Sequence, residues 1–584
     1  MATPYPDRVD TRQPPDKAEE RLLGRLDDIE DEGRLVRDKW APPADIDSDL
    51  TLFRTGGGPH GKKYFTANFI EAFVDRMVAQ LTDNRPFIRI EPRKAGLKDV
   101  AFGLDRIAKV LWEEADMQRQ AFKLCHLAAT TRSAGLYTGY DPSTDEILLE
   151  PIRIDQVSLD PKIQEAARVS RGDYLFIRRI MATDELVIRF PGRGASVEPD
   201  AALSDMRPSE AGGATASILG GLRRVLVSPL SGALGRADRR VSIPRAEITE
   251  CWIRDWRKTT DGALMFPGGR LILRSKDLVL WDGPNPYWDG RWPLDWLDWG
   301  VDPKHPWGRS EPDRLRHIQL PFNQLMDGLV RNQLVSNVLT LVADYDAFPP
   351  EMWKKLQKLD DTLILRKQNR NATAVLTAPP EFGADKLNIA RQMYTMAQML
   401  TGVTDVTMGE TPGSLQSGLA IEGLQEGANL MTRSRASRLE DLYERVGQKL
   451  IARIFQFWTT DRVADLLGPT KAAEDYGHAR QEMLFEKDAA GKLQSTNYES
   501  RSRSMRDFRF TIAPGSSAAG SRVARARLMM EMAKAGFAAG EDVLAAADIP
   551  EPREVMARAQ AEAALRAQAG IPQPGQTKGS GGGR

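Results

Sequence analysis

Ser414 to Trp458 reads SLQSGLAIEGLQEGANLMTRSRASRLEDLYERVGQKLIARIFQFW, and no proline interrupts the chain between Pro412 and Pro469. One long helix is therefore sterically permitted. Glycines between Gly418 and Gly427 each cost up to about 1 kcal/mol in a helix interior, so the first half can bend. At 1.5 Å per residue the stretch spans on the order of 60 Å, longer than a compact domain is usually wide. Apolar residues recur at intervals of three and four, which places them on one helical face: Leu439, Leu442, Val446, Leu450, Ile454 and Trp458.

A glycine- and threonine-rich segment precedes this predicted helix. Thr401 to Gly418 reads TGVTDVTMGETPGSLQSG, and its only charged residues are Asp405 and Glu410. Glycine, proline and threonine in this density favour turns over regular structure. The sequence therefore predicts a mobile loop attached to the end of a long, rigid helix.

Composition excludes several classes of protein. Lys plus Arg and Asp plus Glu both number 81 in 584 residues, so the formal net charge is zero, which argues against coating nucleic acid by bulk electrostatics. Two cysteines, Cys125 and Cys251, are too few for a disulfide framework and fit a reducing compartment. No run of about 18 apolar residues and no signal peptide is present, so we expect a soluble chain without a membrane segment.

Three stretches carry a resemblance to the portal proteins of tailed double-stranded DNA bacteriophages. The first is the loop and helix described above, whose matching residues are Gly413, Gln416, Ser417, Gly418, Ala420, Leu424, Gln425 and Glu426. The second enters a helix through NPYWDGRWPL and PWGRS, with matches at Asn285, Pro286, Gly290, Pro293, Gly308, Ser310, Gln319, Asn323 and Asn332. The third is the helix NFIEAFVDRMVAQL, followed by a turn with Leu81, Thr82 and Pro86. In this resemblance the first stretch corresponds to the family's tunnel loop and the long helix behind it.

The resemblance implies a helix-rich α+β fold, with a wing, a helical stem, a small α/β clip and a C-terminal helical crown. Expected boundaries are a disordered N-terminus at 1–16, a wing at 17–310 with a flexible insertion at about 192–242, a stem helix at 311–338, a clip at 339–383, a returning stem helix at 384–401, a tunnel loop at 402–416, the long helix and second wing part at 417–515, a crown at 516–569 and a flexible tail at 570–584.

Local patterns predict further elements. Lys17–Trp40 reads as a charged helix that ends before Pro42, and Phe122–Leu136 reads as a helix rich in alanine and threonine. Residues 146–161 alternate as strands do, and AEITECWIRDW should pair with ALMFPGGRLILRS around a PGG turn. In the family resemblance, DYLFIRRIMATDEL corresponds to a further strand of the wing. Pro321 should bend the first stem helix or begin a second segment.

Sequence motifs for catalysis are weak. GGGPHGK (Gly56–Lys62) resembles the start of a phosphate-binding loop, and LTLFRT before it could supply the strand that such loops require. Lys63 stands where a hydroxyl must hold magnesium, so the motif is incomplete. The five histidines are scattered without ligand spacing. We therefore predict no enzymatic activity, no cofactor and no metal site.

The predicted channel site is the tunnel loop that the resemblance implies: Thr404, Thr407, Met408, Gly409, Thr411, Gly413, Ser414, Gln416 and Ser417. Further contacts to DNA or to a motor are expected from two basic clusters, one in the clip and one on the long helix: Arg366, Lys367, Arg370, Arg433 and Arg435. For the long helix an equal alternative is a surface paired with nearby acids. Six tryptophans between Trp281 and Trp307 could stack on bases, but their turn-like contexts favour tryptophans that fasten a proline-rich segment to the core.

These expectations describe a protein that forms a ring-shaped channel of about twelve copies at one capsid vertex, through which DNA enters and leaves. The resemblance implies, as partners, double-stranded DNA, the terminase large subunit, a head-tail adaptor protein, and the major capsid and scaffolding proteins. It also implies a location in the virion, with assembly in the host cytoplasm. Two alternatives stay open at this point: a nucleotide-hydrolysing packaging motor, which needs a complete phosphate loop, and a capsid or tail structural protein without a channel.

Overall fold

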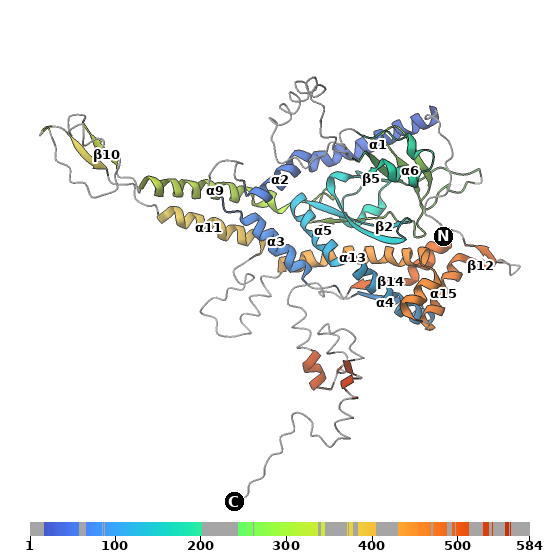
Figure 1. Cartoon of the computed structure of the whole chain (residues 1–584). Coiled ribbons are helices and arrows are strands. Elements are labelled where there is room, and N and C mark those ends of the chain that lie inside the picture. The colour runs from blue at the N-terminus through green and yellow to red at the C-terminus, as the bar shows by residue number, and fades with distance from the viewer. Residues whose placement is uncertain are drawn as a thin grey trace, which may run out of the picture. The chain divides into compact units, whose positions relative to one another are not determined.

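The structure of the chain is a computed structural model. It describes residues 17–57, 66–83, 86, 88–200, 243–260, 262–336, 340–344, 369, 371, 373–377, 384–403, 430–468, 471–487, 493–496, 498–512, 529–536, and single positions or pairs between 540 and 561. The chain divides into two compact units (Figure 1). Unit 1 comprises residues 1–43, 78–309 and 431–584, and unit 2 comprises residues 44–77 and 310–430.

Unit 1 contains most of the β structure. Its helices are α1 (Lys17–Trp40), α4 (Lys98–Glu114), α5 (Met117–Thr131), α6 (Thr183–Arg189), α13 (Leu430–Phe457, from its second residue), α14 (Thr460–Leu467), α15 (Lys471–Leu484) and α16 (Tyr498–Ser504). Its strands are β1 (Ile88–Pro92), β2 (Ser133–Asp141), β3 (Glu146–Arg153), β4 (Val157–Leu159), β5 (Tyr174–Ala182), β6 (Arg245–Ile253), β7 (Arg270–Arg274), β8 (Val279–Pro284), β9 (Leu294–Asp298), β12 (Phe485–Lys487), β13 (Leu493–Ser495) and β14 (Phe508–Ile512).

Unit 2 consists mainly of helices. It holds α2 (Pro43–Thr55, from its second residue), α9 (Glu311–Ser336), α11 (Ala384–Thr401), the antiparallel pair β10 (Thr340–Ala343) and β11 (Ala374–Thr377), and the first part of α3 (Phe69–Thr82), whose last residues belong to unit 1. Helices α9 and α11 lie side by side (Figure 1). The two units together form a helix-rich α+β fold, which confirms the predicted fold class.

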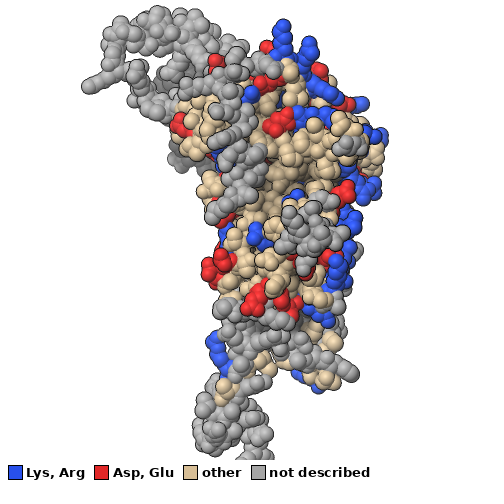
Figure 2. Space-filling view, turned by 90° about the vertical axis from the view of Figure 1, so that its right-hand side faces the viewer, with Lys and Arg blue, Asp and Glu red and all other residues tan. Residues whose placement is uncertain are grey.

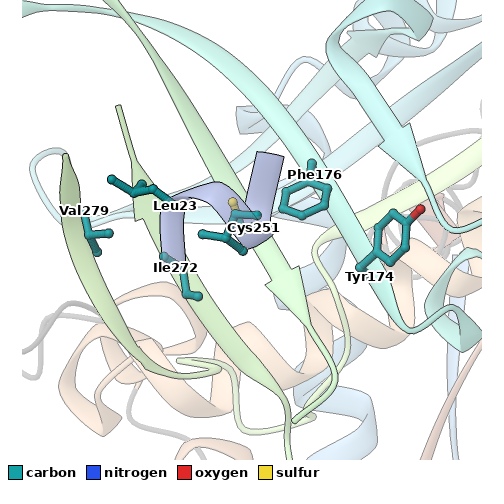
Figure 3. Close-up of a cluster of buried hydrophobic side chains, with 7 residues drawn as sticks. Leu23, Tyr174, Phe176, Cys251, Ile272 and Val279 are labelled. Atoms are coloured by element: carbon teal, nitrogen blue, oxygen red, sulfur yellow. The ribbon is translucent and has the colours of Figure 1, made fainter. Parts of the chain in front are cut away.

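The largest sheet has the strand order β4-β5-β6-β7-β8, with every neighbouring pair antiparallel. Helix α1 covers one face of it. Leu23 points from the helix toward the strands (Figure 3), and Leu26 belongs to the same buried cluster, which includes side chains of four strands: Tyr174, Phe176, Cys251, Ile272 and Val279. Alternate residues of each strand share one face, which is why Tyr174 and Phe176 both reach the helix. Burial raises the pKa of the Cys251 thiol, consistent with a packing role for this cysteine.

Three smaller sheets complete the described part of unit 1. Strand β2 lies between β3 and β9 in one, β12 pairs with β13 in another, and β1 pairs with β14 in the third, which brings Ile88 opposite Ile512. The pairing of β1 with β14 joins segments more than 400 residues apart in the chain.

The surface drawn in Figure 2 carries both positive and negative side chains. Lys and Arg gather along its right-hand edge, and Asp and Glu are scattered elsewhere.

Most predicted elements are confirmed. Helix α1 has the predicted bounds, β6 pairs with β7 across the predicted turn, and the predicted helix NFIEAFVDRMVAQL is α3, whose apolar residues from Ile70 to Leu81 are buried. One prediction is wrong. The helix expected to reach Leu136 ends at Thr131, because Arg132 has φ of 82° and Ser133 onward pairs with β3 and β9.

The segment Leu50–Thr55, which could have supplied the strand before a phosphate-binding loop, is the end of helix α2. Gly56 and Gly57 end that helix with φ of 60° and 81°, values that few L-residues adopt. A Cβ on Gly57 would come within 2.4 Å of the Leu320 side chain on α9. These two glycines therefore terminate a helix and allow close packing. Pro321 lies inside α9, which runs through it as one helix.

Candidate functional site

The predicted tunnel loop spans residues 402–416, and the structure describes its first two residues. The predicted channel residues from Thr404 to Ser417 lie outside the described residues, as do Arg366, Lys367 and Arg370. The structure describes the two helices on either side of it in the chain. Helix α11 of unit 2 ends just before the loop, and α13 begins after it at Leu430. The geometry of these two helices is therefore what the structure contributes to the site.

Helix α11 ends in a defined C-terminal turn. Gly402 has φ of 76°, and its N–H donates to the Gln398 carbonyl at 2.9 Å. The Thr401 hydroxyl donates to the Ala397 carbonyl at 2.9 Å and accepts from the Val403 N–H at 3.3 Å. Val403 is only 1% exposed. The start of the loop is thus fixed to unit 2 at Val403, because the last carbonyls of the helix have partners and the next side chain is buried.

The packing of α11 uses one side of the helix. Tyr394 contacts Phe69 and Phe73 of α3 through ring-to-ring packing at 6.3 and 5.7 Å, and Arg314 of α9 donates to the Leu400 carbonyl at 2.9 Å. The other side carries exposed apolar residues, of which Met396 is 56% and Met399 69% exposed. The chain has no Lys, Arg or His from Gln392 to Thr432. The end of α11 therefore presents an uncharged, methionine-rich surface.

Polar side chains of α9 hold it to the end of α2 and the residues that follow. The buried carboxylate of Asp49 accepts from the Ser310 hydroxyl at 2.7 Å and from Arg316 at 2.6 Å. One and two turns further along α9, Gln319 donates to the Ala67 carbonyl at 2.7 Å and Asn323 to the Gly56 carbonyl at 2.5 Å. Three of the residues quoted for the family resemblance, Ser310, Gln319 and Asn323, thus make buried bonds that fix α9 within unit 2.

The described half of the long helix confirms the predicted apolar face. The side chains predicted to share that face are all buried: Leu439, Leu442, Val446, Leu450, Ile454 and, just after the helix, Trp458. The end of the helix is also capped, since the Tyr476 hydroxyl donates to the carbonyls of Ile454 and Trp458 at 3.0 and 3.1 Å. Arg480 donates to the Phe455 carbonyl at 2.9 Å. Helix α13 is therefore part of the core of unit 1.

Two buried cations of α13, Lys449 and Arg453, pair with carboxylates of the tryptophan-rich segment 281–307. Lys449 lies 2.8 Å from the Asp295 carboxylate and donates to the Leu294 carbonyl at 3.0 Å. One turn further on, Arg453 pairs with Asp289 at 2.9 Å and lies over the Tyr287 ring at 3.4 Å. Lys449 and Arg453 are almost wholly buried. Burial lowers the pKa of Lys449, and the charge of Asp295 opposes that effect. Sequence reasoning missed these pairs, although both cations share a helical face.

A second row of contacts joins α13 to β14. Gln448 donates to the carbonyls of Met505 and Phe508 at 3.2 and 3.0 Å, so one side chain satisfies backbone groups next to and within the strand. A Cβ on Gly447 would come within 2.2 Å of the Phe510 ring, so only glycine allows this approach. The strand is thereby held on two sides, by β1 and by α13.

The two predicted DNA contacts on the long helix have different environments. Arg433 is exposed. Arg435 is 8% exposed, with its guanidinium 4.8 Å from the centre of the Trp299 ring. Its neighbour Arg438 donates to the Asp298 carbonyl at 3.1 Å. For Arg435 and Arg438 the structure favours the alternative of cations held by their own subunit, whereas a DNA contact of Arg433 stays a prediction.

The tryptophans between Trp281 and Trp307 fasten their proline-rich segment to the core, as the preferred interpretation predicted. Five of the six rings are buried: Trp281, Trp292, Trp296, Trp299 and Trp307. Trp296 and Trp307 pack edge to face at 5.7 Å, and the Trp296 ring nitrogen donates to the Pro306 carbonyl at 3.0 Å. The alternative of a base-stacking platform is wrong for these five, because their faces are covered by protein.

Among the described residues, two other classes of site find no support: a metal centre and a membrane-spanning helix. Within those residues, no cluster of three or more His, Cys, Asp or Glu side chains could hold a metal ion. The described helices include none that is both long and apolar enough to span a membrane. The incomplete phosphate-loop motif follows a helix, whereas phosphate-binding loops follow a strand.

Comparison with known proteins gives one family. A family model described as "Phage P22-like portal protein" matches residues 334–579, somewhat less than half of the chain. No curated protein matches. The matched region starts within α9 and includes α11, the predicted tunnel loop, α13 and β14. This match supports the resemblance found in the sequence: over residues 334–579 the chain is similar to the P22-like portal proteins of phages.

Proposed function

We propose that this portal protein assembles into a ring whose central channel passes double-stranded DNA into and out of the capsid, without catalysis of its own. Residues 402–416 then form a tunnel loop between the stem helices, α9 and α11, and the long helix that contains α13. The ring also serves as the docking platform for the terminase large subunit and the head-tail adaptor. The absence of Lys, Arg and His from Gln392 to Thr432 is the observation that supports this assignment best.

The chemistry behind that observation is simple. A duplex carries one negative charge per about 1.7 Å of its axis, so a channel wall rich in cations would hold the duplex in place. The end of α11 exposes methionines, and α13 directs Lys449 and Arg453 to carboxylates of its own subunit. The end of α11 therefore adds no basic side chain near the loop, whereas Lys449 and Arg453 lie toward the far end of α13. A ring then presents many copies of weak contacts without basic side chains to one duplex.

The packaging motor is the weaker alternative. Lys63 stands in place of the hydroxyl that holds magnesium, and Leu50–Thr55 is a helix where a strand is needed. Negative-stain imaging of the purified protein distinguishes the candidates: a ring with a central hole that forms without nucleotide is expected for a portal. A monomer that assembles only with ATP would contradict the proposal.

Deletion of Thr404–Leu415 tests the tunnel loop directly. The segment is poor in apolar residues, so we expect its removal to leave rings intact while DNA packaging or retention fails. The matched control removes the same number of residues from within 201–242 and should package normally. Loop-deleted rings that package and retain DNA as well as the control would overturn the assignment, and loss of rings would show that the loop is structural.

A further inference from the structure

A basic surface lies in unit 1 where β1 pairs with β14. Segments 88–94 and 498–512 together carry seven Arg or Lys residues and only three carboxylates, in a chain with zero net charge. The pairing of the strands brings the segments together, and the Arg93 N–H donates to the Asp507 carbonyl at 2.7 Å. We define the β1–β14 basic surface by its exposed cations: Arg89, Arg93, Lys94, Arg503, Arg506 and Arg509.

Alternate residues of β1 and β14 face the core and the solvent in turn. Ile88, Ile90, Phe508, Phe510 and Ile512 are all buried, so the opposite face of the sheet is left to charged and polar residues. Arg89 is 71% exposed at its side chain, and Arg509 lies opposite Glu91 on the neighbouring strand. The exposed face therefore has no apolar patch.

Few of these cations are neutralised by the subunit. Lys94 pairs with Asp507 at 2.6 Å. The contact between Arg89 and Glu91 is longer, at 4.0 Å. Among the described residues, no carboxylate lies within ion-pair distance of Arg503, Arg506 or Arg509. This differs from Lys449 and Arg453 of α13, which are buried and pair with carboxylates of their own chain. Like charges left close together destabilise a fold through mutual repulsion, so a surface of this kind suits a polyanionic partner.

We infer that the β1–β14 basic surface binds the phosphate backbone of double-stranded DNA outside the channel. An acidic protein is the competing partner, because guanidinium groups match carboxylates as well as phosphates. Stable protein interfaces, however, depend on buried aromatic or aliphatic groups at their centre, and this face offers none. Contacts to phosphates need only cations, since they gain free energy by counterion release. The choice of DNA rests on the proposed function.

Binding of a short random-sequence duplex to the full-length protein, measured by fluorescence anisotropy over a range of salt concentrations, tests the inference. R503Q/R506Q should weaken binding at low salt and reduce the slope of log affinity against log salt by about 0.9 for each lost phosphate contact. The matched control is R21Q/R25Q, which removes two exposed arginines from α1. R503Q/R506Q should keep the melting temperature of the parent, which a merely structural role would lower.

Several outcomes decide against the inference. Equal salt slopes for R503Q/R506Q and R21Q/R25Q would overturn it. Displacement of the duplex by poly-glutamate as effectively as by unlabelled duplex, at equal charge, would assign the surface to an acidic protein instead. The test is independent of the channel, because R503Q/R506Q should form rings with a central hole, and deletion of Thr404–Leu415 should leave this salt-dependent binding unchanged.

Discussion

Helices α13 and α11 flank the same predicted loop but are held in opposite ways. The apolar face of α13 is buried, its cations Lys449 and Arg453 face carboxylates, and Gln448 bonds to β14. Helix α11 packs on one side and leaves Met396 and Met399 exposed. Substitutions on α13 should therefore destabilise unit 1. Substitutions on the exposed side of α11 should leave folding intact and act only through what that side contacts in an assembled ring.

Asp295→Asn should have the largest effect. The change leaves the buried ammonium of Lys449 with the Leu294 carbonyl as its described partner, and an uncompensated buried charge costs about 3–5 kcal/mol in the free energy of unfolding. Urea unfolding followed by tryptophan fluorescence measures it, since Trp296 is the next residue. Lys449→Met is the control and should cost less, because Asp295 still lies 3.6 Å from Arg445. A greater loss for Lys449→Met would contradict the pairing.

Leu439→Ala should come next, with a loss of about 2–5 kcal/mol for a buried leucine. Met399→Ala is its counterpart on α11, where 69% of the residue is exposed, and should change the free energy of unfolding by no more than about 0.5 kcal/mol. Thermal melts of both variants under one condition make the comparison. Equal losses would mean that the exposed side of α11 is buried within the folded subunit.

A pair of glycine substitutions should give the smallest effects, with opposite signs. Gly447→Ala forces a Cβ to within 2.2 Å of the Phe510 ring and should destabilise unit 1 by about 1–3 kcal/mol, despite alanine's better helix propensity. Gly328→Ala on α9 meets no described atom within 4 Å and should stabilise unit 2 by about 0.5–1 kcal/mol. Chemical unfolding of each variant checks the signs. A stabilising Gly447→Ala would show that β14 does not pack against α13.

The local sequence pattern was sufficient to predict several individual helices and strands. The bounds of α1, the apolar face of α13 and the pairing of β6 with β7 could be predicted, because each depends on spacing and turn residues within a short window. Prediction failed at Arg132, where pairing of β2 with two strands ends a helix that alanine and threonine would have continued. The possible strand at Leu50–Thr55, which a phosphate-binding loop would require, is the end of α2.

By itself, the sequence determined the resemblance to portal proteins, the helix-rich class and the position of a segment without basic residues between two helices. Only the tertiary structure decided which cations have partners. Lys449 and Arg503 look alike in the sequence, yet one is buried against Asp295 and the other is exposed beside β14. The reason is physical. Helix and strand periodicity arise from neighbours a few residues apart. Neutralisation of a charge depends instead on which distant segment folds against it, and such segments can lie far apart in the sequence, as β1 and β14 do.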